Sequence, residues 1–65
     1  MRATVNGVER ELAAATIDEL LRDLDVGRDG VAVALNDRVV RRRDYRNARL
    51  ADGDSVEIVR AVAGG

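Results

Sequence analysis

Two glycines, Gly64 and Gly65, close the 65-residue sequence directly after an apolar, strand-like stretch. Glycine has no Cβ, so a backbone ending in Ala63, Gly64 and Gly65 can enter a channel too narrow for other residues. The Gly65 carboxylate would be ionised at neutral pH, and it is an oxygen nucleophile toward a phosphoryl centre. It is also a poor acyl donor until it is activated. These residues predict a terminal carboxylate on which a partner enzyme acts.

Residue types that support independent catalysis are scarce elsewhere in the chain. The sequence has no histidine, cysteine or lysine, so Ser55 has no such base to activate it and no zinc site of His or Cys ligands is possible. Asp52 and Asp54 flank Gly53, but Asp-Gly-Asp is favoured in turns, and we interpret it as a turn. We therefore expect a protein that is not an enzyme and that binds no metal or cofactor itself.

All eleven basic residues are arginine, and six of them cluster at positions 38, 41, 42, 43, 46 and 49. An RNA-binding patch and a docking surface for an acidic protein are two possible roles. We favour a solvated loop, because Asp37 and Asp44 interrupt the cluster and Tyr45 is the only aromatic residue. With a net charge of -1, the chain has no general attraction for nucleic acid. The role of the Arg41–Arg43 run stays open.

Hydropathy predicts no membrane segment. No apolar run approaches the length that spans a bilayer, and the start of the chain lacks the apolar segment of a signal peptide. We expect a cytoplasmic protein that is a monomer on its own and has neither nucleic acid nor a membrane as partner.

Alternating apolar residues predict strands in three parts of the chain. Residues 1–5 alternate, and Asn6-Gly7, the dipeptide most favoured in a type I′ hairpin, leads to a second strand over 8–12. Residues 31–35 alternate and turn at Asn36-Asp37 into a short strand over 38–40. A last strand begins near Val56, with Val56 and Ile58 on one face.

One helix is expected between the two hairpins. Thr16 and Glu19 have the spacing of a capping box, in which Glu19 reaches back to the backbone of Thr16. The helix would run for about ten residues and end at Gly27 as a left-handed cap. Its apolar stripe comprises Ile17, Leu20, Leu21 and Leu24, and its polar face comprises Asp18, Glu19, Arg22, Asp23 and Asp25.

These elements predict an α+β fold. One helix can cover one sheet, so we expect a β-grasp (ubiquitin-like) domain over residues 1–62, with a mixed sheet of four to five strands wrapped on the helix. Residues 63–65 would form a flexible Gly-Gly tail. Tyr45 and Leu50 are interpreted as buried anchors of the long loop, or single helical turn, between residues 41 and 52.

The last strand also predicts a partner-docking surface. If Val56 and Ile58 face the helix, Val59 and Ala61 face away from it, beside two alanines of the neighbouring hairpin if those strands pair. A small apolar patch next to the tail is a plausible protein contact, although an outward valine and closely packed alanines also occur without one. The predicted docking residues are Val59, Ala61, Val62, Arg60, Ala32 and Ala34.

Over essentially its whole length the sequence resembles the ubiquitin-like sulfur carrier proteins, most closely the thiamin-thiazole carrier (ThiS) type. The resemblance lies in the N-terminal hairpin and in the segments Thr16-Ile17-Asp18-Glu19-Leu20-Leu21, Val33-Ala34-Leu35-Asn36 with Val39-Val40, Leu50 to Ile58, and Arg60 to Gly65. Two positions depart from the family: Arg41 stands where proline is common, and Tyr45 where tryptophan is common.

The resemblance implies a set of partners. An E1-like adenylyltransferase of the ThiF type would use ATP and magnesium to adenylate Gly65. A sulfur donor such as a cysteine desulfurase would convert the adenylate to a thiocarboxylate, and thiazole synthase (ThiG type) would accept the sulfur. Gly64 and Ala63 would thread into both partner sites. A carrier for molybdopterin, tRNA thiolation or cysteine synthesis, a ubiquitin-like modifier, a plain interaction domain and a small RNA binder remain alternatives.

Overall fold

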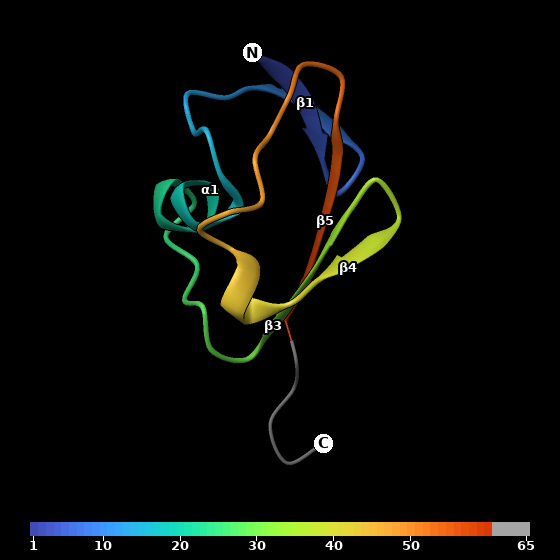
Figure 1. Cartoon of the computed structure of the whole chain (residues 1–65). Helices are drawn as coiled ribbons and strands as arrows, with labels where there is room; N and C mark the ends of the chain where they lie inside the picture. Colours follow the sequence, from blue (N-terminus) through green and yellow to red (C-terminus); the bar gives the residue numbers. More distant parts are fainter. Residues whose placement is uncertain (61–65) are drawn as a thin grey trace.

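The final strand of the chain lies at the centre of a five-stranded mixed sheet in the computed structural model, which describes residues 1–60 (Figure 1). The strand order is β2-β1-β5-β3-β4. The central strand β5 runs parallel to β1 and antiparallel to β3. This arrangement confirms the predicted mixed sheet and β-grasp layout. The strands are β1 (Arg2–Val5), β2 (Val8–Glu11), β3 (Val31–Leu35), β4 (Arg38–Val40) and β5 (Ser55–Arg60).

Both predicted hairpin turns are confirmed. A type I′ turn needs a positive φ at both central residues. Asn6 and Gly7 have φ values of 52° and 81°, and Asn36 and Asp37 have values of 52° and 68°. Each turn therefore sets the register of its hairpin, with Val5 opposite Val8 and Leu35 opposite Arg38.

The helix α1 (Ile17–Asp23) starts at the predicted residue but has seven residues rather than about ten. The Thr16 Oγ1 accepts a hydrogen bond from the Glu19 backbone N–H at 3.2 Å, which confirms Thr16 as the cap. The reciprocal bond differs from the prediction. The Glu19 Oε1 accepts from the N–H of Ala15 at 2.8 Å, one residue before Thr16.

The predicted cap at Gly27 is wrong. Leu24 is the C-cap residue, and Asp25 directly after it takes the left-handed conformation, with a φ of 57°. The Asp25 N–H donates to the Arg22 carbonyl at 3.0 Å, and the Val26 N–H donates to the Leu21 carbonyl at 2.8 Å. These two bonds form a Schellman motif, in which aspartate occupies the position usually held by glycine.

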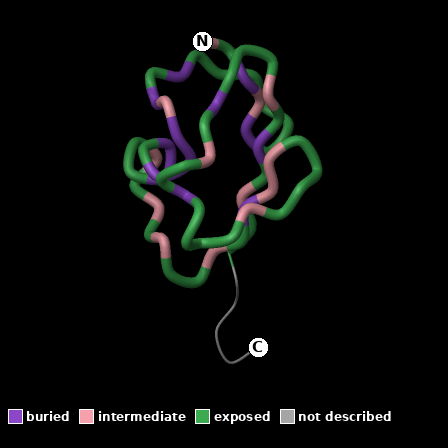
Figure 2. Tube along the Cα trace, in the orientation of Figure 1, coloured by how far each residue is buried: buried purple, intermediate pink, exposed green. Residues whose placement is uncertain are grey.

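The core lies between α1 and one face of the sheet (Figure 2). The loop after β4 closes it: a 3-10 turn, η1 (Arg42–Asp44), leads to Tyr45, which is 1% exposed. The Tyr45 carbonyl accepts from the Asp18 N–H at 3.0 Å, so the loop also satisfies a donor in the first turn of α1. Tyr45 and Leu50 are both buried, as predicted.

Asp18 is not on a solvent-facing side of the helix as predicted, because it is only 3% exposed. Its Oδ2 lies 2.8 Å from the Arg22 Nη2, and its Oδ1 lies 3.4 Å from the Arg28 Nε. Arg22 belongs to the next turn of the helix, whereas Arg28 comes from the segment that follows it. A buried carboxylate thus joins α1 to the connection that leads into β3.

Candidate functional site

The strand β5 carries the chain toward its predicted reactive end. Arg60 is the last residue of β5 and the last described residue. The predicted residues Ala61, Val62, Ala63, Gly64 and Gly65 lie outside the described part of the chain, as does the predicted domain boundary after residue 62.

Two asparagine side chains hold β5 in place. Asn36 Oδ1 accepts from the Ser55 N–H at 2.9 Å, and Asn36 Nδ2 donates to Asp54 Oδ1 at 3.0 Å. Asn6 bonds the backbone of Ile58, close to the point where β5 ends. Sequence analysis assigned these asparagines to turns only and missed their second role. Both side chains point back at β5 because their turns lie beside it.

The structure places three of the predicted docking residues, Ala32, Ala34 and Val59, on the sheet face that points away from α1. Ala32 is directly opposite Val59, and Val59 is 60% exposed. Ala34 is half-buried one step further along β3. Arg60 is exposed but lies on the helix side of the sheet, because it is opposite Val31 and alternates with the outward-facing Val59. The position of these residues agrees with the strand periodicity, and their docking role stays a prediction.

Val39 is a further member of this surface that sequence analysis missed. It lies opposite Ala34 in the β3–β4 pair and is 80% exposed. The signal appears only once the partner strand is known. Val40 pairs with the buried Val33, so the preceding residue must face the other way. We call Ala32, Ala34, Val39 and Val59 the outer patch.

The outer face of the sheet changes character from one edge to the other. The outer patch covers β3, β4 and β5, whereas β1 and β2 present an ion-pair cluster on the same face. The Arg2 Nη2 lies 2.6 Å from Glu9 Oε1, and the Arg2 Nη1 lies 3.8 Å from Glu11 Oε1. The hydrogen bond that Arg2 donates to Glu9 raises the pKa of the Arg2 guanidinium, and the negative charge of Glu9 acts in the same direction. A docking partner would therefore meet an apolar half and a charged half.

A small apolar cavity opens beside the end of β5. It has a volume of about 190 Å³ and is lined by Val5, Asn6, Leu24, Val26, Val31, Ile58 and Arg60. Arg60 is one of the lining residues and lies three residues before Ala63, where the predicted tail begins. The cavity thus adjoins the place where a partner would have to grip the chain.

The structure confirms the interpretation of Asp52-Gly53-Asp54 as a turn. Asp52 Oδ1 accepts from the Arg2 N–H at 2.7 Å, and Asp54 Oδ2 accepts from the Ala51 N–H at 2.8 Å. Gly53 has a φ of 87°, which a side chain would disfavour. Within residues 1–60, no group of three or more His, Cys, Asp or Glu residues could hold a metal ion. The two carboxylates therefore have structural partners.

The six arginines of the basic cluster are all exposed, as a solvated loop requires. Arg42 pairs with Asp29 at 2.5 Å, which ties η1 to the segment before β3. Docking of an acidic protein stays an alternative for the others. No helix in the described part of the chain is long and apolar enough to cross a membrane.

Comparison with known proteins identifies close relatives over this same length of chain. The sequence profile of the ThiS family matches residues 3–65. The sulfur carrier protein ThiS of Thermus thermophilus is 38% identical over 61 residues, covering 94% of this chain and 95% of that protein. The sulfur carrier protein ThiS of Escherichia coli is 36% identical over 53 residues, covering 82% of this chain and 80% of that protein.

A third relative is much longer. The thiazole synthase of Paramagnetospirillum magneticum is 38% identical over 66 residues, which cover 100% of this chain and only 20% of that protein. This chain therefore matches one segment, about a fifth, of that synthase.

A solved structure supports the same relationship. The crystal structure of the thiamine biosynthesis protein ThiS from Geobacter metallireducens superposes with a TM-score of 0.84 at 35% identity, and both chains are covered completely. The match includes the mixed sheet, the single helix and the central final strand described above. The sequence profile, the relatives of equal length and the superposition agree, and the chain belongs to the ThiS family.

Proposed function

We propose that this chain is a sulfur carrier of thiamin biosynthesis, which holds sulfur as a thiocarboxylate on Gly65. The observation that carries the proposal is its end-to-end likeness to the Thermus thermophilus sulfur carrier, with 94% of this chain and 95% of that protein covered. The match of the family profile through residue 65 supports the assignment of the chemistry to the Gly-Gly segment. The chain acts as a co-substrate rather than an enzyme.

The first step is activation by a partner. A Gly65 carboxylate oxygen attacks the α-phosphorus of ATP, pyrophosphate leaves, and an acyl adenylate forms. An E1-like adenylyltransferase binds the ATP and magnesium for this step. The absence of histidine, cysteine and lysine from the sequence supports this division of work, since this chain has few groups that could assist phosphoryl transfer.

The second step introduces sulfur. The terminal sulfur of a protein persulfide, supplied by a donor such as a cysteine desulfurase, bonds to the acyl carbon while AMP leaves. A thiol then attacks the other sulfur, the S–S bond breaks, and its electron pair stays on the sulfur bound to the Gly65 carbonyl. The product is the thiocarboxylate. Gly64 and Ala63 keep the segment slim enough to enter the partner sites.

Thiazole synthase is the acceptor that the comparisons favour. A protein named thiazole synthase in Paramagnetospirillum magneticum matches the whole of this chain over a fifth of its own length. Fusion of two functions in one chain keeps them at high effective concentration. We infer that this chain delivers its sulfur to a separate synthase of the same kind.

Docking to both enzymes uses the outer patch together with Arg60, Ala61 and Val62. The patch is supported by the exposure of Val39 and Val59 and by the place of Val59 on the strand that leads to Gly65. An apolar surface beside the reactive segment lets a partner grip the folded domain while the tail enters its site.

Intact-mass spectrometry tests the carrier function. The purified chain is incubated with ATP, magnesium, an E1-like adenylyltransferase, a desulfurase and cysteine, and we expect exchange of one oxygen for sulfur. A variant lacking Gly65 is the matched control and should stay unchanged. An unmodified terminus on the intact chain, under conditions in which the same enzymes modify the Escherichia coli carrier, would overturn the proposal.

A further inference from the structure

The strand β2 forms one edge of the sheet, and within residues 1–60 no strand pairs with its outer side. The Leu12 N–H donates to the Met1 carbonyl at 2.7 Å, and the Met1 amino group donates back to the Leu12 carbonyl at 3.0 Å. Bonded pairs alternate along an antiparallel ladder. The backbone groups of Val8 and Arg10 therefore point at β1, whereas those of Glu9 and Glu11 point to the free edge.

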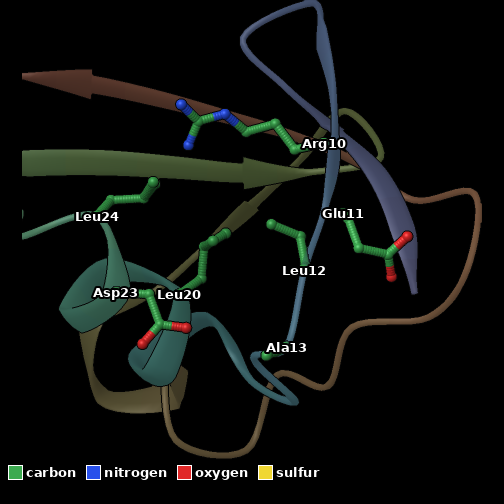
Figure 3. A pocket seen from close by; sticks show the side chains of 7 residues that line it. All are labelled: Arg10, Glu11, Leu12, Ala13, Leu20, Asp23 and Leu24. Carbon is green, nitrogen blue, oxygen red and sulfur yellow. The ribbon is translucent and has the colours of Figure 1, made fainter.

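A groove runs beside this edge, between β2 and α1 (Figure 3). Its volume is about 460 Å³, and Leu12, Leu20 and Leu24 form its apolar floor. Figure 3 shows the Arg10 side chain reaching from the strand toward Leu24, while Glu11 points away from the groove on the other side of the strand. An unpaired backbone edge and an apolar groove thus lie next to each other.

The charges along β2 are separated by face. Ala3 and Val5 are buried under α1, so their partners Arg10 and Val8 face the helix side. Glu9 and Glu11 consequently face the outer side, where both are exposed and pair with Arg2, and Glu11 also pairs with the Met1 amino group at 2.7 Å. Residues 8–12 therefore read apolar, acidic, basic, acidic, apolar, with the two acidic residues on one face and the single basic residue on the other.

This pattern opposes pairing with a second copy of the chain. In an antiparallel pair of two β2 strands, residues that share a face of the sheet lie opposite each other. Glu9 and Glu11 of one copy would therefore lie opposite Glu9 or Glu11 of the other copy in each register that pairs them. Like charges directly opposite destabilise a strand pair, and opposite charges stabilise it. The edge therefore fits a strand of the complementary pattern: basic residues opposite Glu9 and Glu11, an acidic residue opposite Arg10, and apolar residues at the ends.

From these observations we propose that the free edge of β2 and its groove bind an extended segment of a partner protein by strand addition. The segment carries alternating apolar, basic, acidic, basic and apolar residues. Its backbone bonds the exposed groups of Glu9 and Glu11, its apolar residues flank the groove beside Val8 and Leu12, and its acidic residue meets Arg10. One strand, β1, separates this edge from β5, the nearest strand of the outer patch, so the segment binds beside that patch rather than on it.

A capped pentapeptide, Val-Arg-Glu-Arg-Leu, is a direct probe, because its pattern is complementary in either strand direction. The matched control is Val-Glu-Arg-Glu-Leu, which is the sequence of residues 8–12 itself. In a titration of the isotope-labelled full chain followed by NMR, we expect shifts in β2 and α1 with the probe. The control peptide should bind about tenfold more weakly, since three attractive cross-strand pairs become repulsive.

Amide hydrogen exchange reports the register. The probe should slow exchange at Glu9 and Glu11, whose N–H groups point outward, and leave Val8 and Arg10 unchanged because β1 already bonds them. A charge-reversal variant distinguishes strand pairing from nonspecific electrostatic attraction. Arg10→Glu should weaken the probe about tenfold and restore binding to Val-Arg-Arg-Arg-Leu, whereas Arg38→Glu, on the opposite edge strand β4, should change neither.

Three results would overturn the proposal. The first is the absence of shifts with millimolar probe. The second is shifts confined to β4 or to the outer patch. The third is equal binding of the probe and the control, which would mean that the charge pattern of β2 selects nothing. None of these results bears on sulfur transfer, so the carrier function and this binding edge are tested separately.

Discussion

The side chain of Asn6 bonds the backbone of Ile58 in both directions. Its Oδ1 accepts from the Ile58 N–H at 2.7 Å, and its Nδ2 donates to the Ile58 carbonyl at 3.1 Å. The parallel pair of β1 and β5 ends with Val5 opposite Val56. The side-chain amide of Asn6 therefore makes the hydrogen bonds that a backbone peptide would make, and it continues the β1–β5 ladder two residues before β5 ends at Arg60.

Replacing Asn6 with glycine should lower the free energy of unfolding by about 1–3 kcal/mol, because two hydrogen bonds are lost while the positive φ stays easy to adopt. Urea unfolding measures the change. Asp37→Gly is the matched control: Asp37 also has a positive φ, of 68°, but no side-chain hydrogen bond of Asp37 is found among the described residues. The control should be neutral or slightly stabilising. Equal losses in both variants would contradict the role given to the Asn6 side chain.

Two glycines should respond to alanine with opposite signs. Gly53 has a φ of 87°, so Gly53→Ala should destabilise the protein by about 1–2 kcal/mol through backbone strain alone, since a Cβ there would meet no other atom. Gly27 lies outside the left-handed region and is equally open, so Gly27→Ala should stabilise by about 0.4–1 kcal/mol. Thermal unfolding of both variants is the measurement. A loss of stability in Gly27→Ala would indicate that Gly27 acts as the helix cap, as the sequence predicted.

Asp18→Asn should destabilise the protein by about 1–3 kcal/mol, because the buried carboxylate loses its charge opposite Arg22 and Arg28. Asp23→Asn is the control in the same helix. Asp23 is exposed and makes no ion pair within residues 1–60, so its change should stay within about 0.5 kcal/mol. Chemical denaturation of both variants decides between them, and similar small effects would show that the ion pairs of Asp18 contribute little.

We expect substitutions in the outer patch to weaken binding to a partner enzyme while leaving the fold intact. Val59→Asp and Val39→Asp should each weaken binding to the E1-like adenylyltransferase by about tenfold or more, as removal of an interface anchor does. Ala51→Asp is the control, because Ala51 is exposed and lies outside both the outer patch and the β2 edge. Calorimetry compares the three variants, and circular dichroism checks the fold. Unchanged affinity in both patch variants would remove the outer patch from the docking surface.

Local features of the chain were sufficient to predict most of its elements. Asn6-Gly7 and Asn36-Asp37 each allow the positive φ values that a two-residue hairpin requires, so both turns could be located from residue type alone. Strand alternation placed Val59 on the face opposite to Val56, because side chains in a strand alternate strictly. Tyr45 could be predicted as an anchor because it is a large apolar residue in an otherwise polar loop.

The errors arose where distant residues decide the outcome. Asp18 looked solvent-facing because its helical neighbours are charged, and only the fold brings Arg28 and the loop of Tyr45 to it. The left-handed residue after the helix is Asp25 rather than the predicted Gly27, because the helix ends where its apolar stripe ends, at Leu24. Val39 was missed because three residues are too few to show alternation without their partner strand.

The central place of β5 has a consequence for synthesis on the ribosome. Before Ser55–Arg60 emerges, the nascent chain can form α1 and two hairpins that no strand joins, and two-stranded hairpins are marginally stable in water. Folding can be completed only when β5 inserts between β1 and β3, which residues 6–30 separate in the sequence. A prematurely terminated translation product lacking β5 should therefore stay unfolded and open to proteolysis, so that cellular quality control removes defective copies before a partner enzyme meets them.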